Sequence, residues 1–349
     1  MMKPLYVCIP VFNGGGLIRR TLKNILEQDF GDFTVLVYDD GSKDRTAENV
    51  AKLAEQESRI RLVRGGENKG RGAARNALLA LAADGMIAWQ DADDAWRPSK
   101  LRDQLAARAR LAQASGDDAF VLISTYDKVE EKDDGVVVSR PNIPPETYDL
   151  DFVLGPRFKT CAFQLQAVMG PASSFLGAGG FDDALNWSED LDMALKLLRA
   201  GYKIVGHPAE EGLAIYHHSL RRARGPVVEA SHLVLRDRFR DFATERGFDI
   251  DRIFQMRATG YLTEIYLKHG RFPPALTANL RALRLVDGAD DDQFRRIANN
   301  ILSILNRSVA KYLDDRDAKL AALNARDVND AAAPTVEPQA DLEDGRGSV

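Results

Sequence analysis

Short apolar runs alternate with stretches of helical periodicity through the first hundred residues. Near-continuous apolar runs rich in β-formers cover residues 5–11, 33–38, 60–63 and 86–90, a pattern typical of strands that are buried on both faces. Between them, apolar residues recur at helical spacing over 17–26, 47–54 and 73–83. The alternation predicts βαβ units, and therefore an α/β fold with a doubly wound, mostly parallel sheet and helices on both faces.

The middle of the chain predicts a helix, further strands and a long irregular loop. We expect a helix over 99–114, a hairpin that pairs 119–128 with 136–139, a strand over 161–169 and another over 202–205. A clear helix begins at Glu189-Asp190 and stops at Gly201. The proline-rich segment 140–160 is expected to form a flexible loop over the site.

After Pro226 the pattern changes to helices alone. The predicted domains are therefore an α/β domain over 1–225 and a helical C-terminal region over 226–325. Residues 326–349 are rich in Ala, Pro and Asp without apolar periodicity, and a disordered tail is expected there. The apolar residues of 294–312 are expected to pack against the α/β domain, and contact with acceptor, a second subunit or a membrane is the alternative.

Polar loops follow the first four predicted strands. They contain Phe12-Asn13, Asp39-Asp40, the glycine-rich stretch 65–72 and the acidic stretch 91–94. Because ligands bind at the carboxyl ends of the strands in such sheets, the four loops are expected to converge on one crevice.

Composition and charge limit the classes of function. A net charge of −5 gives no support for nucleic-acid binding. Cys8 and Cys161 lie in apolar runs, so they are interpreted as buried thiols rather than as a disulfide or a metal set. The N-terminus lacks the layout of a signal peptide, and no run approaches the roughly 18 apolar residues that span a bilayer. A cytoplasmic location is expected, with peripheral contact at the inner face of the membrane left open.

Three carboxylates occupy four positions after the fourth strand, at Asp91, Asp93 and Asp94. Like charges this close repel one another unless a cation lies among them, and carboxylate oxygens suit Mg²⁺ or Mn²⁺. The alternative is an acidic turn that caps the helix after Pro98. Asp94 is the carboxylate expected to have only this structural role.

Six stretches, in order over about residues 4–220, resemble the family 2 glycosyltransferases, which have the GT-A fold. Each stretch alone is a weak match, but six in the same order make chance agreement very improbable. The matching stretches are Ile9-Pro10-Val11-Phe12-Asn13, Tyr38-Asp39-Asp40-Gly41-Ser42-Lys43-Asp44-Arg45-Thr46, Asn68-Lys69-Gly70-Arg71-Gly72-Ala73-Ala74-Arg75-Asn76, Asp91-Ala92-Asp93-Asp94, Gly179-Gly180-Phe181-Asp182 and Glu189-Asp190.

The resemblance implies inverting transfer of a sugar from a nucleotide-sugar, most often a UDP-sugar, with Mg²⁺ or Mn²⁺. It implies that Asp40 accepts from the base, with Pro10, Phe12 and Asn13 against the base and ribose. It also implies that Arg75 lies near the diphosphate, Asp91 near the ribose and sugar, and Asp93 on the metal as the ligand of a DXD motif.

The same resemblance makes Asp190 the general base, with Glu189 as the second candidate. An acceptor hydroxyl needs a base within hydrogen-bond reach, and a helix dipole favours a charged carboxylate there. Simple capping of the helix is the alternative for this pair. His217 is a candidate third metal ligand, although either His217 or His218 is more simply interpreted as a surface or core histidine.

The function predicted from the sequence is transfer of a single sugar to a hydroxyl of a glycan or lipid-linked acceptor in cell-surface polysaccharide synthesis. The Gln-x-x-Arg-Trp motif of processive synthases is missing, which favours a single transfer. A nucleotidyltransferase is one alternative, but it would carry Arg and Lys in the loop after the first strand, and none occurs before Arg19. An inactive nucleotide-sugar binding protein is the other. A homo-oligomer stays open, as do the sugar and the acceptor.

Overall fold

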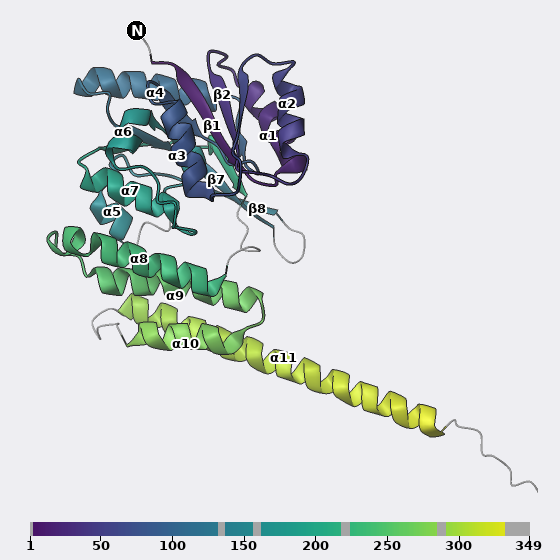
Figure 1. The fold of residues 1–349 in the computed structure, drawn as a ribbon. Helices are drawn as coiled ribbons and strands as arrows, with labels where there is room; N and C mark the ends of the chain where they lie inside the picture. The colour runs from purple at the N-terminus through teal and green to yellow at the C-terminus, as the bar shows by residue number, and fades with distance from the viewer. Residues whose placement is uncertain (1–2, 132–136, 156–161, 218–223, 285–290, 332–349) are drawn as a thin grey trace, which may run out of the picture. The chain divides into compact units, whose positions relative to one another are not determined.

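The computed structural model describes residues 3–131, 137–155, 162–217, 224–284 and 291–331. The chain divides into two compact units, Met1–Ile265 and Tyr266–Val349. Both β-sheets lie in the first unit, and the second is made of helices (Figure 1). Among the described residues, no helix is both long and apolar enough to cross a bilayer.

A seven-stranded sheet organises the first unit, in the order β10-β6-β9-β4-β1-β2-β3. All neighbours in it are parallel except β9, which runs antiparallel to β4 and β6. The predicted α/β fold with a mostly parallel sheet is therefore confirmed. The strands are β1 (Leu5–Val11), β2 (Thr34–Asp39), β3 (Ile60–Arg64), β4 (Met86–Trp89), β6 (Val121–Ser124), β9 (Val168–Pro171) and β10 (Ile204–His207).

Helices cover both faces of this sheet. In Figure 1, β1 and β2 lie between α3 (Arg71–Leu81) on one side and α1 (Gly15–Leu26) with α2 (Thr46–Ala54) on the other. The strands β1, β2 and β4 are almost entirely apolar and mostly buried, which explains why they read as continuous apolar runs. The edge strand β3 buries only Ile60 and carries the exposed Arg61 and Arg64. Cys8 in β1 is a buried free thiol, and Cys161 lies outside the described residues.

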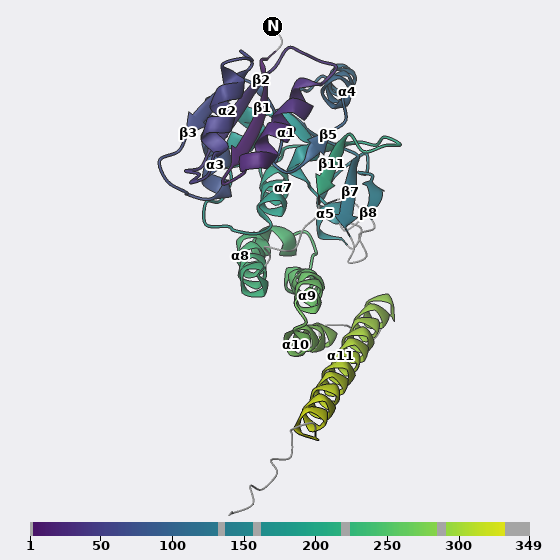
Figure 2. The ribbon, with the colours of Figure 1, turned by 90° about the vertical axis from the view of Figure 1, so that its right-hand side faces the viewer.

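A second sheet of four strands lies beside the first, in the order β5-β11-β7-β8 (Figure 2). Its strands are β5 (Ala95–Trp96), β11 (Ala214–His217), β7 (Tyr126–Glu131) and β8 (Val137–Asn142). The predicted hairpin is correct for β7 and β8, which pair antiparallel, but residues 121–124 belong to the large sheet instead. The run 121–123 is wholly apolar and buried, whereas β7 is mostly charged, although its first residues, Tyr126 and Asp127, are also buried.

Two expectations for the middle of the chain are wrong. Part of the loop predicted over 140–160 is the short helix α5 (Leu150–Leu154), where Asp149 accepts the Phe152 N–H at 2.9 Å and Phe152 is buried. The strand predicted over 161–169 begins only at Val168, after a 3₁₀ turn at Leu165–Ala167. A short apolar run has no periodicity that distinguishes a buried turn from a strand.

The remaining helices lie after β5 along the chain. The α8 helix and most of α9 belong to the first compact unit, so this unit extends beyond residue 225. The functional division between 1–225 and 226–325 stays a prediction. These helices are α4 (Lys100–Ser115), α6 (Ala172–Gly177), α7 (Glu189–Arg199), α8 (Gly225–Thr244), α9 (Ile250–Lys268), α10 (Phe272–Leu283) and α11 (Asp291–Ala331).

The second unit contains α10, α11 and the end of α9. The α10 helix packs against α11 through small buried residues such as Ala278 and Ala282, and α11 contributes Ile297 and Ile304. The α11 helix continues to Ala331, and residues 332–349 of the predicted tail lie outside the described residues.

Candidate active site

The first four strands end at the same edge of the large sheet. In the sheet, β4, β1, β2 and β3 are consecutive parallel neighbours, with Cys8 opposite Trp89 and Val11 opposite Asp39. The loops that follow these strands therefore open side by side, as the sequence predicted. They form one candidate site at the carboxyl ends of the strands.

Asp40 holds the glycine-rich loop in place. Its side chain is buried, and its two carboxylate oxygens accept the backbone N–H groups of Lys69 at 3.0 Å and Gly70 at 2.9 Å. Gly41 has a φ of +73°, and a Cβ there would lie 2.7 Å from the backbone carbon of Glu67. Only glycine permits this close approach of the two loops.

The loop after β1 combines an exposed ring with a fixed backbone. Phe12 is 43% exposed and Pro10 is half-buried. Asn13 has a φ of +50°, donates its N–H to the Ser42 hydroxyl at 2.8 Å and accepts the Lys43 N–H at 2.9 Å. In the structure Asn13 therefore joins two loops of the site, and the contacts predicted for it with base and ribose stay a prediction.

The acidic turn after β4 is supported from two sides. The Thr21 hydroxyl of α1 donates to the Ala92 carbonyl at 2.7 Å. Asp94 is buried and accepts the backbone N–H of His217 at 2.8 Å, which ties the turn to β11. Burial is the main reason why the pKa of Asp94 is raised to about 7. Asp94 thus has a structural contact, but with β11 rather than with the helix after Pro98.

Asp93 and Asp91 differ from Asp94 in being accessible. Asp93 is exposed, and the Asp91 side chain is 30% exposed. The His217 side chain is 43% exposed, and its Nδ1 lies 3.6 Å from the Asp94 carboxylate. The structure therefore brings His217 to the acidic turn, although at least 123 positions along the chain separate it from these residues. His218 lies outside the described residues.

A buried arginine joins the acidic turn to the start of α7. Arg75 is 1% exposed, and its guanidinium donates to Asp91 at 2.9 Å and to Glu189 at 2.7 Å. Arg71 donates to the same Glu189 oxygen at 2.7 Å. The Arg75 guanidinium also lies over the Phe181 ring, 5.5 Å from its centroid. Arg75 thus binds two carboxylates of the protein, and its predicted proximity to a diphosphate stays a prediction.

Glu189 and Asp190 have opposite electrostatic environments. Burial disfavours the charged form of Glu189, but the Arg71 and Arg75 guanidiniums outweigh burial and lower its pKa to about 2. Burial, followed by repulsion from Glu189, raises the pKa of Asp190 to about 7. Glu189 is thus a permanently charged ion-pair partner, while Asp190 can exchange a proton near neutral pH. The arrangement favours Asp190 over Glu189 as the general base.

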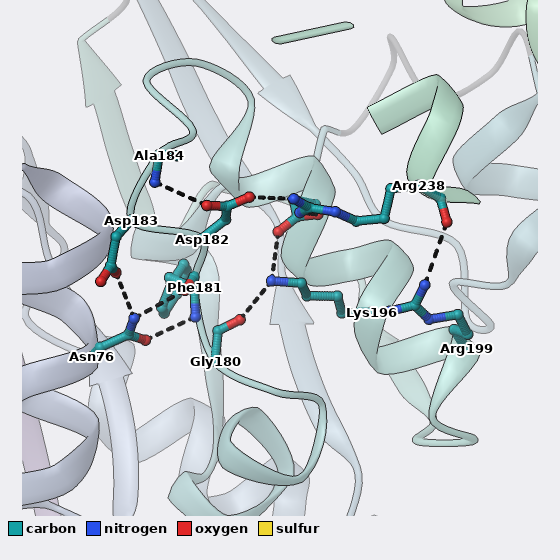
Figure 3. A network of polar contacts seen from close by, with 10 residues as sticks. Asn76, Gly180, Phe181, Asp182, Asp183, Ala184, Lys196, Arg199 and Arg238 are labelled. Carbon is teal, nitrogen blue, oxygen red and sulfur yellow. Dashed lines mark hydrogen bonds and ion pairs between the residues drawn. The ribbon is translucent and has the colours of Figure 1, made fainter. Parts of the chain in front are cut away.

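The turn at residues 179–184 packs closely against α3 (Figure 3). The Asn76 side chain accepts the Phe181 N–H at 2.8 Å and donates to the Phe181 carbonyl at 2.9 Å and to Asp183 at 2.8 Å. A Cβ on Gly72 would lie 2.4 Å from the Asp182 carbonyl oxygen. Two of the stretches quoted for the resemblance, 68–76 and 179–182, therefore contact each other. Their contact supports the Phe181 ring, over which the Arg75 guanidinium lies.

The α8 helix supports the same turn from the other side (Figure 3). Arg238 forms ion pairs with Asp182 of the turn and with buried Asp192 of α7, the latter at 2.6 Å. Lys196 of α7 contacts Asp192 at 2.9 Å and the Gly180 carbonyl at 2.9 Å. The turn is therefore fixed between α3, α7 and α8.

The fit to a divalent cation depends on the chemistry of the donors. Within the described ranges, no three His, Cys, Asp or Glu side chains gather closely enough to hold a metal ion by themselves. Mg²⁺ is usually bound through only one or two carboxylates together with substrate phosphates. The accessible Asp93, with Asp91 beside it, fits this mode, and His217 is the adjacent imidazole.

The comparison with protein families agrees with this geometry. Residues 6–169 match the model of glycosyl transferase family 2. The matched segment contains the first four strands with their loops, including Asp40, Arg75, Asp91 and Asp93. Asp190 and α7 lie outside it.

Sequence relatives of the chain carry glycosyltransferase or polysaccharide names. The chain is 26% identical over 201 residues to an uncharacterised glycosyltransferase of Rickettsia typhi, covering 58% of this chain and 60% of the relative. It is 29% identical over 232 residues to the succinoglycan biosynthesis protein ExoW of Rhizobium meliloti, covering 62% of this chain and 72% of ExoW. The chain thus spans about three fifths of the length of its Rickettsia relative.

Solved structures share the fold over most of the chain. S. aureus TarS in complex with UDP superimposes with a TM-score of 0.54 at 17% identity, covering 89% of this chain and 92% of that one. The mannosyltransferase PcManGT from Pyrobaculum calidifontis, in complex with GDP-Man and Mn²⁺, gives a TM-score of 0.51 at 19% identity, covering 90% and 88%. The predicted GT-A fold class, with a helical region after it, is confirmed.

Proposed function

We propose that this chain is a metal-dependent, inverting glycosyltransferase that transfers one sugar from a nucleotide-sugar, with a UDP-sugar favoured. The proposed acceptor is a hydroxyl of a glycan or lipid-linked intermediate in cell-surface polysaccharide synthesis. The name of ExoW supports the polysaccharide context, and the UDP and GDP-Man complexes of TarS and PcManGT support the donor class.

One observation carries the proposal. The Arg75 guanidinium bonds Asp91 on one side and Glu189 on the other, so the acidic turn and the start of α7 meet at one buried cation. Asp190 follows Glu189 directly and has a pKa raised to about 7, first by burial. The acidic turn, proposed to bind the metal and the donor diphosphate, is thereby held close to Asp190, which is proposed to accept the proton. A single displacement requires both groups near the reacting atoms.

The residues of the chain divide the work as follows. Asp190 takes the proton of the acceptor hydroxyl, and the Arg71–Arg75–Glu189 cluster keeps its position fixed. Asp93 and Asp91 would hold Mg²⁺ or Mn²⁺, which neutralises the charge that develops on the leaving diphosphate. Phe12 and Asp40 would contact the base, because the Phe12 ring is exposed and the Asp40 N–H donates to the carbonyl of Val11, the residue before Phe12. The deprotonated hydroxyl would attack the anomeric carbon on the face opposite the diphosphate, so that the new glycosidic bond forms as the bond to the diphosphate breaks, and this single displacement gives inversion.

We also propose that the α11 helix contacts a membrane or a second copy of the chain. Several large apolar side chains of this helix are exposed, and in a stable fold such a stripe is usually covered. These side chains are Leu302, Leu305, Val309, Tyr312 and Leu313.

The test uses a panel of nucleotide-sugars with Mn²⁺. Thermal shift first identifies which of them bind, and release of nucleoside diphosphate then measures their turnover. Asp190→Asn should cut transfer by several orders of magnitude while donor binding persists, and Asp93→Ala should remove the metal dependence of UDP binding. Metal-dependent UDP binding that survives unchanged in Asp93→Ala would disprove the ligand assignment. Release of pyrophosphate from a nucleoside triphosphate and a sugar 1-phosphate, with no release of diphosphate from any nucleotide-sugar, would favour a nucleotidyltransferase. Binding of nucleotide-sugars without turnover would favour an inactive sensor.

A further inference from the structure

Aromatic side chains from separate parts of the chain gather around the proposed base. Trp187 lies three positions before Asp190, and Tyr261 comes from α9. Their ring centroids are 6.1 Å apart and the ring planes are nearly perpendicular, at 79°. Tyr261 also lies 5.7 Å from the ring of buried His232 in α8. The segment after residue 226 thus contributes a ring to the neighbourhood of the base.

The electrostatics connect these rings with the carboxylate. Burial, and next the negative charge of Asp190, raises the pKa of Tyr261 to about 12. The pKa of Tyr216 in β11 is also raised, first by burial and then by the charges of Asp94 and Asp190. Asp190 therefore has the rings of Tyr216 and Tyr261 as electrostatic neighbours.

The exposure of the rings differs from that of core aromatics. Trp187, Tyr216 and Tyr261 are all half-buried, as is Asp190, whereas Tyr148 and Phe163 are completely buried. Between Trp187 and the α7 helix, Ser188 has a φ of +58°, a left-handed conformation that a non-glycine residue adopts at a cost. Such strain tends to occur where a side chain must point in a functional direction.

We propose that Trp187 and Tyr261 form the platform that binds the acceptor, and that the acceptor presents a pyranose ring to it. A pyranose has an apolar face of C–H groups and an edge of hydroxyls. Half-buried aromatic rings match the apolar face, and a carboxylate beside them matches the hydroxyl edge. The inference rests on the proposed function, since it assigns the acceptor side of that same site.

Placement of Tyr261 depends on α9 being fixed. Arg257, one turn before Tyr261, is buried and donates to the Val153 carbonyl of α5. The position of the ring is therefore set by the packing of α9 on the first unit. The α9 helix would then help to select the acceptor, while the loops after β1 to β4 bind the donor.

The chain has a built-in reporter for this platform. Of its three tryptophans, Trp89 and Trp96 are each 1% exposed, while Trp187 is half-buried. Acrylamide quenching of tryptophan emission therefore reports mainly on Trp187. The probes are the methyl pyranosides of glucose, galactose, mannose and N-acetylglucosamine, added with UDP and Mn²⁺ present. Sorbitol, which has hydroxyls but no ring face, is the control solute.

At least one methyl pyranoside should protect Trp187 from acrylamide in a saturable way, and sorbitol should not. Tyr261→Leu should raise the half-saturating concentration about tenfold, whereas Tyr261→Phe keeps the ring and should behave like the wild type. Tyr266→Leu is the matched control, because Tyr266 lies on the same helix and its ring lies against Arg271. Trp187→Phe should remove the quenchable emission, which verifies the reporter.

Absence of protection by every pyranoside, or equal protection in Tyr261→Leu and wild type, would overturn the platform. If Tyr261→Leu does not fold, calorimetric titration of Trp187→Leu with the same pyranosides decides, because unchanged affinity contradicts the proposal. The two proposals fail separately. Protection without turnover of any nucleotide-sugar would contradict only the proposed transferase, and turnover without protection would contradict only the platform.

Discussion

Two adjacent carboxylates, Glu189 and Asp190, have different chemistry because only one of them reaches the arginines. Glu189 accepts from both Arg71 and Arg75, which lowers its pKa to about 2 against the effect of burial. Asp190 accepts the Leu191 N–H at 2.7 Å, and burial together with the charge of Glu189 raises its pKa to about 7. A base must be ionised to accept a proton, so the rate should fall as the pH drops below about 7.

Glu189→Gln should move this acidic limb of the kcat profile to lower pH, by about one unit. The change removes the charge that repels an ionised Asp190, so the pKa of Asp190 falls, and its ionised form persists to lower pH. At pH 8 the variant should retain transfer activity, measured as release of nucleoside diphosphate across pH 5 to about 9.

Glu48→Gln is the matched control, because it removes the same charge from an exposed position in α2 and should leave the profile in place. Loss of activity at every pH in Glu189→Gln, with the fold intact by circular dichroism, would instead make Glu189 the base. An unshifted profile would mean that the charge of Glu189 does not act on Asp190.

The sequence predicted the members of the site better than their contacts. Asp40, Asp91 and Asp93 follow strands, and a parallel sheet brings strand ends together, so their convergence was predictable. The ion pair of Arg75 with Glu189 joins residues 114 positions apart, and no local rule relates such positions. Tyr261 was missed for the same reason, because a helical pattern reports which face is apolar but not which neighbour it meets.

At the scale of elements, the turn at 179–184 depends on helices from three parts of the chain. Asn76 of α3 holds its backbone, Lys196 of α7 holds the Gly180 carbonyl, and Arg238 of α8 holds Asp182. The sequence pattern located α3 and α7 within a few residues, whereas no local pattern showed that 119–128 is divided between two sheets. The glycines 179 and 180 both have positive φ, which explains why the turn is glycine-rich.

Arg238→Leu should destabilise the fold by about 1–3 kcal/mol, the cost of losing hydrogen bonds to charged groups. The Arg238 side chain is 24% exposed, and its partner Asp192 is 1% exposed, so water replaces the lost contacts poorly. Chemical denaturation gives the free energy of unfolding. The turn at 179–184 should also loosen, and with it the Phe181 ring that lies against Arg75. Transfer activity should therefore fall more than the affinity for the donor.

Arg240→Leu is the control for this prediction. It lies two positions along the same helix and also forms ion pairs, with Asp237 and Asp251, but all three side chains are 39% to 60% exposed. Exposed pairs contribute at most about 1 kcal/mol, so this variant should be nearly as stable as the wild type. Equal stability losses in the two variants would show that the contacts of Arg238 have no special role.

At the scale of the whole molecule, every candidate residue of donor and acceptor binding lies in the unit Met1–Ile265. The second unit consists of helices, and its buried residues between α10 and α11 are mainly small or aliphatic, such as Ala278 and Ile304. The α9 helix crosses the boundary, with Tyr261 before it and Tyr266 after it. The two units are therefore expected to differ in their response to donor ligands.

Hydrogen exchange with and without UDP and Mn²⁺ measures this response. A ligand that binds only the native first unit stabilises that unit by mass action, so its amides should exchange more slowly. The largest protection is expected at Lys69 and Gly70, whose N–H groups bond Asp40, and across the acidic turn 91–94. Amides of α10 and α11 should exchange at unchanged rates. Protection confined to α10 and α11, with none at Lys69 or Gly70, would contradict donor binding at the strand ends, because a ligand held there must first order the loop that Asp40 anchors.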